Sequence, residues 1–276
     1  MLTKANPMSI IPRKRRHLGF TLVELLPPIG LAGLMGVVAS MLLPALARAK
    51  AKANRIKCVN NISQVGRSFL AFANDNNARY PWLLTDAQQQ AMGFGKGAVY
   101  ETSTLFANRS IKAELQTPMI LLSPCDPERF AANEIVQETW INGNQKTVLN
   151  GGHSYGMAVG SPTGNGSDEA RFGTVICMTR NISGPINKED SLSDQADNPV
   201  ASTAKKFAFW KGAEKHPADK RTMAGLLSSQ GQLGTVDGAC RWSNDAALKA
   251  DIKQHHNELG GNYKGSPSGI IDTPND

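Results

Sequence analysis

The chain has 276 residues and a formal net charge of +7, with 41% hydrophobic and 19% charged residues, which excludes a chain that is disordered throughout. Its length allows one sizeable core or two small ones. Five basic residues in 1–19 and six between Arg48 and Arg67, against the single acid Glu24, leave a net charge of −3 on residues 68–276. Because a nucleic-acid-binding domain normally carries positive charge in its folded part, we expect no nucleic-acid partner.

The long apolar run of the chain extends from Phe20 to Leu46 and contains one charged residue, Glu24. At about 1.5 Å per residue, a helix over this run would be roughly 40 Å long, which exceeds the roughly 30 Å of a bilayer core. The run can therefore span a membrane. Basic residues stand on both sides of it, at 13–16 and at 48–57, so charge alone does not fix its orientation.

Two processing hypotheses fit this N-terminus. The small-residue sequence at 45–47 is typical of a signal peptidase site, and a cut after Ala47 would release residues 48–276 as a secreted protein. However, the apolar run is much longer than the roughly 7–15 residues of such a signal, and a charge near its start is unusual there. In the second hypothesis the cut lies before the run, which then stays in the mature protein.

The residues at the start of the run carry a family resemblance. The sequence GFTLVELL at 19–26, behind a short basic leader, resembles the processing signal of type IV pilins and type II secretion pseudopilins. The resemblance implies that a prepilin peptidase cuts between Gly19 and Phe20, and that the new amino group of Phe20 is methylated. It also implies that Glu24 pairs with this amino group on a neighbouring subunit during assembly. An ionisable side chain within a membrane helix is also a functional-site candidate on physical grounds.

Further segments extend the resemblance to a prepilin-type subgroup, strongly at 42–52, 55–61 and 75–81, and more weakly at 123–127, 154–157 and 235–238. The strong part covers residues 13–81, which is under a third of the chain. The resemblance implies an α+β, pilin-like fold, in which a long N-terminal helix packs on a small antiparallel-sheet head with long loops.

The function implied by the resemblance is structural, not enzymatic: a subunit or minor pseudopilin of a type II secretion pseudopilus or type IV pilus-like filament. Its partners would be the prepilin peptidase, other pilin or pseudopilin subunits and inner-membrane lipid, with no cofactor and no metal. The chain would cross the inner membrane once, with the leader cytoplasmic and the head periplasmic or extracellular. The alternative is a secreted soluble enzyme or binding protein cut after Ala47.

The expected organisation in chain order is a leader (1–19), a transmembrane helix (20–46), an amphipathic helix (47–73), a globular head (74–262) and a flexible tail (263–276). The amphipathic helix is predicted from an apolar stripe with steps of four and three residues, formed by Cys58, Ile62, Val65, Phe69 and Phe72. Basic residues between 48 and 57 would lie on its solvated face.

The run Asn74-Asp75-Asn76-Asn77 should end this helix, because Asn and Asp bond their own backbone and tolerate left-handed conformations. A calcium-binding loop is the less favoured interpretation, since no EF-hand spacing is present. Near the start of the apolar run, Pro27 and Pro28 cannot donate helical hydrogen bonds, so we expect a kink or local opening there.

Residues 82–231 are rich in loop-forming residues, and short extended segments are expected near 119–122, 146–149, 154–159, 172–179 and 206–210. A hairpin is expected at 233–242, where Asp237-Gly238 suits a two-residue turn. A last helix, capped by Ser243 or Asn244, should pass through Leu248, Ile252 and Leu259 and end at Gly260-Gly261.

Residues 152–156 match the G-x-S-x-G pattern of a hydrolase nucleophile elbow, which requires a helix after Ser154. The residues after Gly156 cannot sustain a helix, so we do not favour a hydrolase. His216, His255 and His256 could nominally complete a triad, but nothing places them near the serine, and the histidines are expected at the surface.

The four cysteines, Cys58, Cys125, Cys177 and Cys240, form no C-x-x-C motif, so neither a zinc ribbon nor a redox motif is indicated. Export would permit disulfide bonds, and four cysteines allow three pairings that the sequence does not separate. Cys58 can equally serve as a small apolar residue of its helix.

Overall fold

The computed structural model describes residues 21–131, 152–160, 166–167, 170–184, 208–217, 222–259 and 271–273. The chain divides into two compact units, residues 1–49 and residues 50–276, and we call the second the globular unit. The described residues combine helices with one small antiparallel sheet, behind a long apolar N-terminal helix. The predicted α+β class is confirmed at this level.

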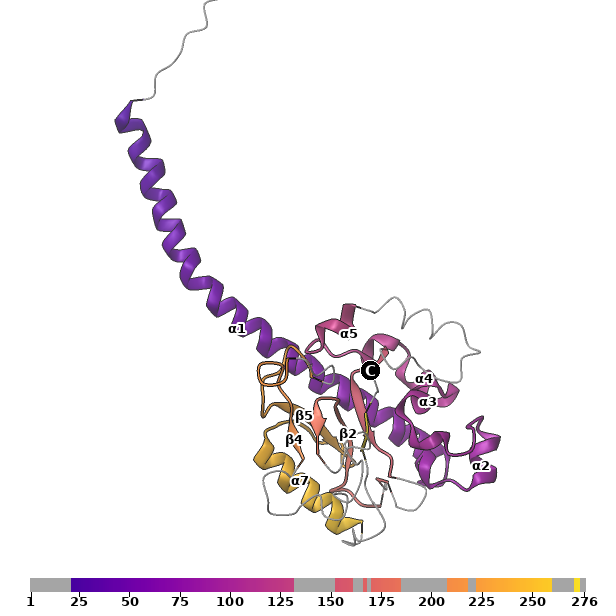
Figure 1. Ribbon diagram of the computed structural model, residues 1–276. Helices are drawn as coiled ribbons and strands as arrows, with labels where there is room; N and C mark the ends of the chain where they lie inside the picture. Colours follow the sequence, from indigo (N-terminus) through magenta and orange to yellow (C-terminus); the bar gives the residue numbers. More distant parts are fainter. Residues whose placement is uncertain are drawn as a thin grey trace, which may run out of the picture. The chain divides into compact units, whose positions relative to one another are not determined.

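Helix α1 extends from Leu22 to Asp75 without interruption (Figure 1). Pro27, Pro28 and Pro44 all lie inside it, so the local opening that the first two prolines predict is not seen. A helix can absorb a proline by bending, while the turns on either side keep their hydrogen bonds. The chain is helical on both sides of the pair, and the predicted kink stays a prediction.

The predicted apolar stripe on the second half of α1 is confirmed. Cys58, Ile62, Val65 and Phe69 are fully buried, and Phe72 is 2% exposed. Most of the basic residues before them are exposed, as expected. The exception is Arg55, which is half-buried because its Nη2 donates a hydrogen bond to Gln230 Oε1 at 2.5 Å.

Helix α1 ends where the Asn-rich run predicts. Asn77 and Ala78 adopt φ angles of 56° and 60°, in the left-handed region. The amide of Ala78 donates to the carbonyl of Ala73 at 2.9 Å, and the Asn76 side chain donates to the carbonyl of Phe72 at 2.8 Å. These bonds satisfy carbonyl groups that the end of a helix leaves without partners.

Short helices follow α1, and the sequence analysis did not predict them: η1 (Pro81–Leu83), α2 (Asp86–Ala91), η2 (Ala98–Tyr100), α3 (Thr102–Ala107), α4 (Arg109–Leu115), η3 (Pro118–Leu121) and α5 (Pro127–Ala131). The extended segment expected near 119–122 is wrong, since η3 occupies most of it. Such short helices show little periodicity, and local caps help to define them. Thr85 and Gln88 form a capping box at α2, and Asn108 caps α4.

The main sheet is antiparallel, with strand order β6-β5-β2-β1-β7. Its strands are β1 (Tyr155–Ala158), β2 (Val175–Thr179), β5 (Gly231–Thr235), β6 (Cys240–Ser243) and β7 (Ile271–Asp272). A separate pair joins β3 (Ile182–Ser183) to β4 (Phe209–Trp210). The strands expected within 154–159 and 172–179 and at the end of 206–210 are confirmed, and the segment 146–149 lies outside the described residues.

The hairpin of β5 and β6 is confirmed, with Gly234 opposite Cys240, but its turn is longer than the predicted two residues. Asp237 keeps a negative φ, and only Gly238 is left-handed, at 84°. The amide of Val236 instead pairs with the carbonyl of Thr174 at 2.9 Å. Val236 is buried and lies within the turn, because the amide of Gly238 donates to the carbonyl of Thr235 at 3.0 Å.

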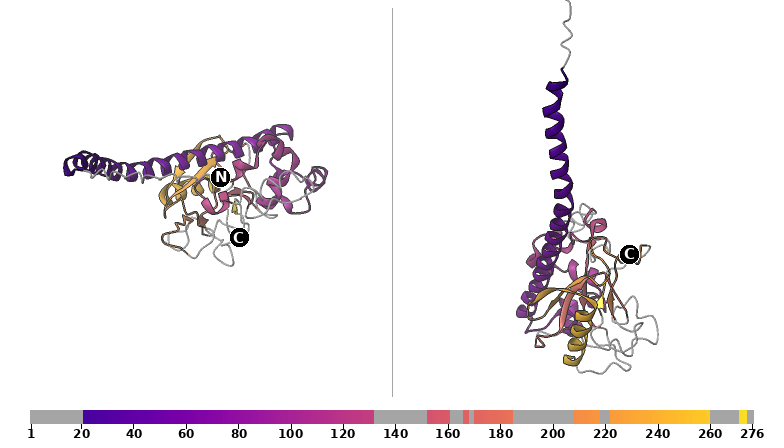
Figure 2. Two further views of the ribbon diagram at one scale, coloured as in Figure 1. Left: turned by 90° about the horizontal axis from the view of Figure 1, so that it is seen from above. Right: turned by 90° about the vertical axis from the view of Figure 1, so that its left-hand side faces the viewer.

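The sheet of the globular unit lies between the buried stripe of α1 and helix α7 (Asp245–Glu258), as Figures 1 and 2 show. On the α1 side, the stripe packs with Tyr155, Met157 and Cys177 of the sheet and with Phe106 of α3. On the other side, Leu248 and Ile252 of α7 pack with residues of β2, β4 and β5.

The cap of α7 is Asn244, one of the two predicted candidates, whose Oδ1 accepts from the amide of Ala247 at 2.8 Å. Leu248, Ile252 and Leu259 are buried as predicted, and Gly260-Gly261 lie outside the described residues.

Part of the segment predicted as a flexible tail is described, and it belongs to the main sheet. Residues 271–272 form β7, with Asp272 opposite Met157 of β1. The carboxylate of Asp272 is buried and accepts from the amide and the hydroxyl of Thr102, at 2.7 and 2.9 Å. The composition of residues 263–276 does not reveal this contact, because Thr102 is distant from Asp272 in the sequence. The rest of segment 263–276 lies outside the described residues.

Candidate functional site

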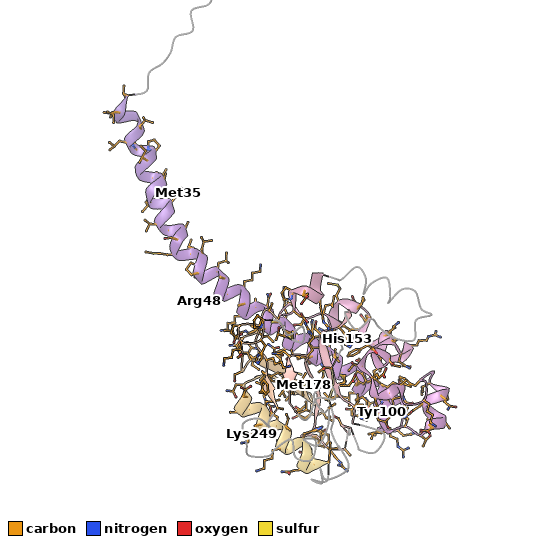
Figure 3. All side chains as sticks on the ribbon, viewed as in Figure 1. Met35, Arg48, Tyr100, His153, Met178 and Lys249 are labelled. Atoms are coloured by element: carbon orange, nitrogen blue, oxygen red, sulfur yellow. The ribbon has the colours of Figure 1, made fainter. Side chains whose placement is uncertain are left out.

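The N-terminal part of α1 exposes apolar side chains on every face. All described side chains from Leu22 to Leu46 are exposed, with Met35 among them in Figure 3. The large ones are Leu22, Val23, Leu25, Leu26, Ile29, Leu31, Leu34, Met35, Val37, Val38, Met41, Leu42, Leu43 and Leu46. Within the described residues, α1 is the one helix that is long and apolar enough to cross a membrane.

The predicted processing and assembly residues lie at or beyond the edge of what the structure describes. Gly19 and Phe20 lie outside the described residues, and so does the side chain of Glu24, whose backbone belongs to the first turn of α1. Their roles therefore stay predictions. The alternative cleavage site at 45–47 lies inside α1.

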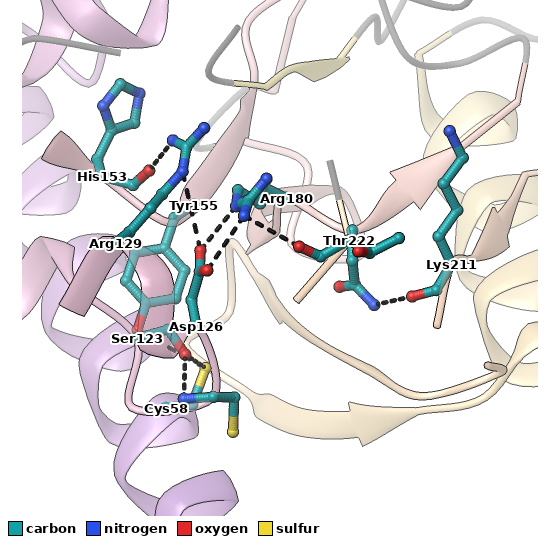
Figure 4. A network of polar contacts seen from close by, with 11 residues as sticks. Cys58, Ser123, Asp126, Arg129, His153, Tyr155, Arg180, Lys211 and Thr222 are labelled. Carbon is teal, nitrogen blue, oxygen red and sulfur yellow. Dashed lines mark hydrogen bonds and ion pairs between the residues drawn. The ribbon is translucent and has the colours of Figure 1, made fainter. Parts of the chain in front are cut away.

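A buried polar node forms where the segment before α5 meets the end of β2 (Figure 4). We define it as Asp126, Arg129 and Arg180. Arg180 donates from Nε and Nη2 to the two oxygens of Asp126, at 2.6 and 3.1 Å, and from Nη2 to the carbonyl of Thr222 at 3.0 Å. Arg129 donates to the carbonyl of His153 at 2.5 Å.

Both members of the Asp126–Arg180 pair are 1% exposed. A buried ion pair offsets its desolvation cost only when its geometry is good and hydrogen bonds satisfy its polar atoms. The two-pronged contact meets this condition. It fixes the segment that carries Asp126 against the sheet, and we assign the node a structural role.

Cysteine and serine side chains form a second polar group beside the node (Figure 4). Ser123 Oγ donates to Cys58 Sγ at 3.1 Å and accepts from the amide of Cys125 at 3.1 Å. The hydroxyl of Tyr155 also donates to Cys58 Sγ, at 3.6 Å. Burial raises the pKa of the Cys58 thiol well above its ordinary value. A hydrogen bond from Cys58 and the positive charge of Arg55 lower the pKa of the Cys125 thiol.

The G-x-S-x-G segment does not form a nucleophile elbow. Ser154 is fully buried, its amide donates to the carbonyl of Leu121 at 2.8 Å, and its carbonyl accepts from the amide of Arg180 at 3.1 Å. Strand β1 begins at the next residue, Tyr155, where an elbow requires a helix. The preceding His153 is also buried, with Nε2 at 3.1 Å from Thr102 Oγ1.

The expectation of surface histidines is wrong for His153 and His255, which are both fully buried. His255 Nδ1 accepts a hydrogen bond from the amide of Val175 at 3.1 Å. That amide lies at an irregularity in the pairing of β2 with β5, so the imidazole supplies the acceptor. The side chain of His256 lies outside the described residues.

A groove of about 680 Å³ lies between the second half of α1 and the segment around η3. Lysine, amide and apolar side chains line it: Lys50, Asn54, Lys57, Asn60, Asn61, Gln64, Met119, Leu122, Pro124 and Pro127. Amide and lysine groups of this kind can bind carbonyl and carboxylate groups of a polypeptide.

In the part of the chain that the structure describes, no three His, Cys, Asp or Glu side chains converge to hold a metal ion. Compared with known proteins, the chain matches no family model, no curated protein and no solved structure.

The sequence analysis missed the polar node and the contact of Ser123 with Cys58. Asp126 and Arg180 stand far apart in the chain, so no local spacing connects them. One signal was present: Arg180 directly follows the apolar strand β2, where a charge is costly unless it meets a partner.

Proposed function

We propose that the protein is a membrane-anchored structural subunit of a pilus-like filament, produced by cleavage between Gly19 and Phe20. The observation that carries the proposal is the change of character along one helix. From Leu22 to Leu46, α1 is apolar and exposed on every face, whereas from Cys58 onward it buries a single stripe in the globular unit. A helix that is apolar all round requires lipid or other helices to cover it.

The size of the exposed apolar surface supports lipid as the covering. Moving one large aliphatic side chain out of water contributes roughly 1.5–3 kcal/mol, and the exposed segment carries such side chains along its whole length. The pilus-like part of the proposal rests on the resemblance of GFTLVELL at 19–26 to the pilin processing signal. In that arrangement Glu24 meets the Phe20 amino group of a neighbouring subunit, and each charge stabilises the other in lipid.

The alternative, a secreted protein cut after Ala47, would also remove the exposed apolar side chains. The helical conformation of residues 45–47 favours the first proposal, because proteolysis occurs most readily in exposed loops and not inside helices.

The mass of the mature N-terminus separates the two functions. We expect the protein isolated from membranes to begin with a methylated Phe20. A chain beginning at Arg48 and recovered from the soluble fraction would instead identify a secreted protein.

A pair of matched glycine variants tests the cleavage site. Gly19→Leu should leave the precursor uncut, because the peptidase needs a residue without a side chain at the bond. Gly30→Leu is the control, since a Cβ atom at Gly30 would meet nothing within 4 Å, and it should be processed normally. Normal processing of both variants would refute the site.

Assembly is tested at Glu24. Glu24→Ala should be processed yet recovered poorly in sheared filaments or crosslinked oligomers, because the Phe20 amino group loses its partner in lipid. Ser40→Ala is the matched control, since the described bond of the Ser40 hydroxyl goes to the carbonyl of Val37 in the same helix. Equal recovery of Glu24→Ala and Ser40→Ala would count against the assembly role.

A further inference from the structure

Two of the four cysteines are brought together from distant parts of the chain. Cys58 lies in the buried stripe of α1, and Cys125 lies in the segment between η3 and α5. Ser123 Oγ bonds to both residues, at 3.1 Å to Cys58 Sγ and 3.1 Å to the amide of Cys125.

We propose that Cys58 and Cys125 form a disulfide bond when the globular unit folds outside the cytoplasm, and that Cys177 and Cys240 remain thiols. The location rests on the proposed function, whereas the pairing rests on the geometry alone. The bond would join α1 covalently to the segment between η3 and α5 within the globular unit.

The backbone around Cys125 is held to α1 and to the rest of the globular unit. The side chain of Asn61 donates to the carbonyl of Leu122 at 3.1 Å, and the amide of Gly225 donates to the carbonyl of Cys125 at 2.8 Å. Asp126 is anchored by Arg180. These contacts fix the segment on both sides of Cys125, and Ser123 holds this segment against Cys58.

The second pair is separated by a strand. Gly234 of β5 is the register partner of Cys177 on one side and of Cys240 on the other. Two strand spacings place the α carbons of the two cysteines roughly 9–10 Å apart. A disulfide requires less than about 7 Å, so Cys177 and Cys240 cannot pair without moving the sheet.

The oxidation is a thiol–disulfide exchange with an external disulfide, either that of an oxidoreductase or oxidised glutathione. The Cys125 thiolate attacks one sulfur of this oxidant, and the first leaving thiolate takes up a proton. The Cys58 thiolate then attacks the mixed disulfide at the Cys125 sulfur and releases the second thiol. Two protein thiols are oxidised and one external disulfide is reduced to two thiols. Because both sulfurs are buried in the folded unit, the exchange precedes the packing of the Cys125 segment on α1.

The test uses the full chain, isolated in detergent from cells that export it, alkylated under denaturing conditions without reduction and mapped by peptide mass. We expect one linked pair of peptides, Cys58 with Cys125, and alkylation of Cys177 and Cys240. Cys58→Ser and Cys125→Ser should each abolish the link, whereas the control Cys177→Ser should keep it. Reduction should lower the thermal midpoint of the wild type by about 5–10 °C and leave that of Cys58→Ser unchanged.

Refolding in oxidised glutathione separates the pairing from the location. Here the reduced, denatured chain is returned to native conditions with oxidised glutathione as the only oxidant. A link through Cys177 or Cys240, or four thiols after refolding, would overturn the pairing. The Cys58–Cys125 link after refolding, with four thiols in protein taken from cells, would support the pairing and overturn the proposed export of the globular unit.

Discussion

The two halves of α1 differ in what covers their apolar side chains. Between Leu22 and Leu46 these side chains occupy every face and are exposed, whereas between Cys58 and Phe72 they form one stripe that the globular unit buries. The helix is continuous, so secondary structure does not distinguish the halves. The two halves must therefore be stabilised by different partners. We expect substitutions in the buried half to change the free energy of unfolding, and substitutions in the exposed half to change membrane binding.

The largest effect is expected from Phe69→Ala in the buried stripe. The Phe69 ring packs 5.8 Å from that of Trp82 and 6.1 Å from that of Phe106, measured between centroids. Its removal should lower the free energy of unfolding by about 3–5 kcal/mol, through lost burial and the cavity left behind. Chemical denaturation of the full chain in detergent measures this.

Two control variants remove apolar side chains that are exposed. Leu34→Ala lies in the exposed half of α1, and Phe172→Ala removes an exposed ring of the globular unit. Each should change the free energy of unfolding by less than about 0.5 kcal/mol. If Leu34→Ala destabilised the globular unit as much as Phe69→Ala, the separation of the two halves would be wrong.

The second prediction concerns membrane binding by the exposed half of α1. Leu34→Asp places a charge near the middle of the exposed half, where insertion into a bilayer should become about 2.5–3.5 kcal/mol less favourable. The membrane-bound fraction should fall, while the unfolding transition of the globular unit stays where it was. Fractionation and thermal denaturation measure the two quantities, and a retained membrane fraction would contradict a lipid environment for this half.

The third prediction compares two basic residues within the second half. Arg55→Ala removes the hydrogen bond to Gln230 and should lower the free energy of unfolding by about 1–2 kcal/mol. Lys52→Ala, three residues earlier and exposed, should change it by less than about 0.5 kcal/mol. Equal effects in denaturant titrations would mean that Arg55 contributes no more than a solvated charge.

The sequence predicted the features that depend on local periodicity. The stripe from Cys58 to Phe72, the Asn-rich end of α1, the strands β1 and β2, and the Asn244 cap of α7 are all read from spacings of a few residues. The features it missed depend on contacts between distant segments. The buried side chain of His255 accepts a hydrogen bond from the amide of Val175 in β2, and the carboxylate of Asp272 accepts one from the amide of Thr102. No pattern within one segment carries that information.

The candidate site divides in the same way. The apolar run and its length were predictable because lipid imposes a composition on every residue of a helix that crosses it. The polar node and the approach of Cys125 to Cys58 were not, because they arise only when the segment before α5 packs on α1 and β2. The sequence left three pairings of the four cysteines open. The strand register, which places Gly234 between Cys177 and Cys240, was needed to exclude a disulfide between these two.

The smallest effect is expected at the prolines of the exposed half. Pro27 and Pro28 deprive the carbonyls of Val23 and Glu24 of their helical donors, yet α1 remains helical through the pair. Replacing both prolines with valine restores two donors near the start of the helix. The fraction of the protein bound to membranes and the fraction incorporated in filaments should therefore stay the same or rise. Since these residues belong to the unit that ends before Lys50, the free energy of unfolding of the globular unit should change by less than about 0.5 kcal/mol. A larger shift in denaturant titrations would show that strain in the exposed half reaches the globular unit along α1, and the two halves would then have to be treated as one cooperative element.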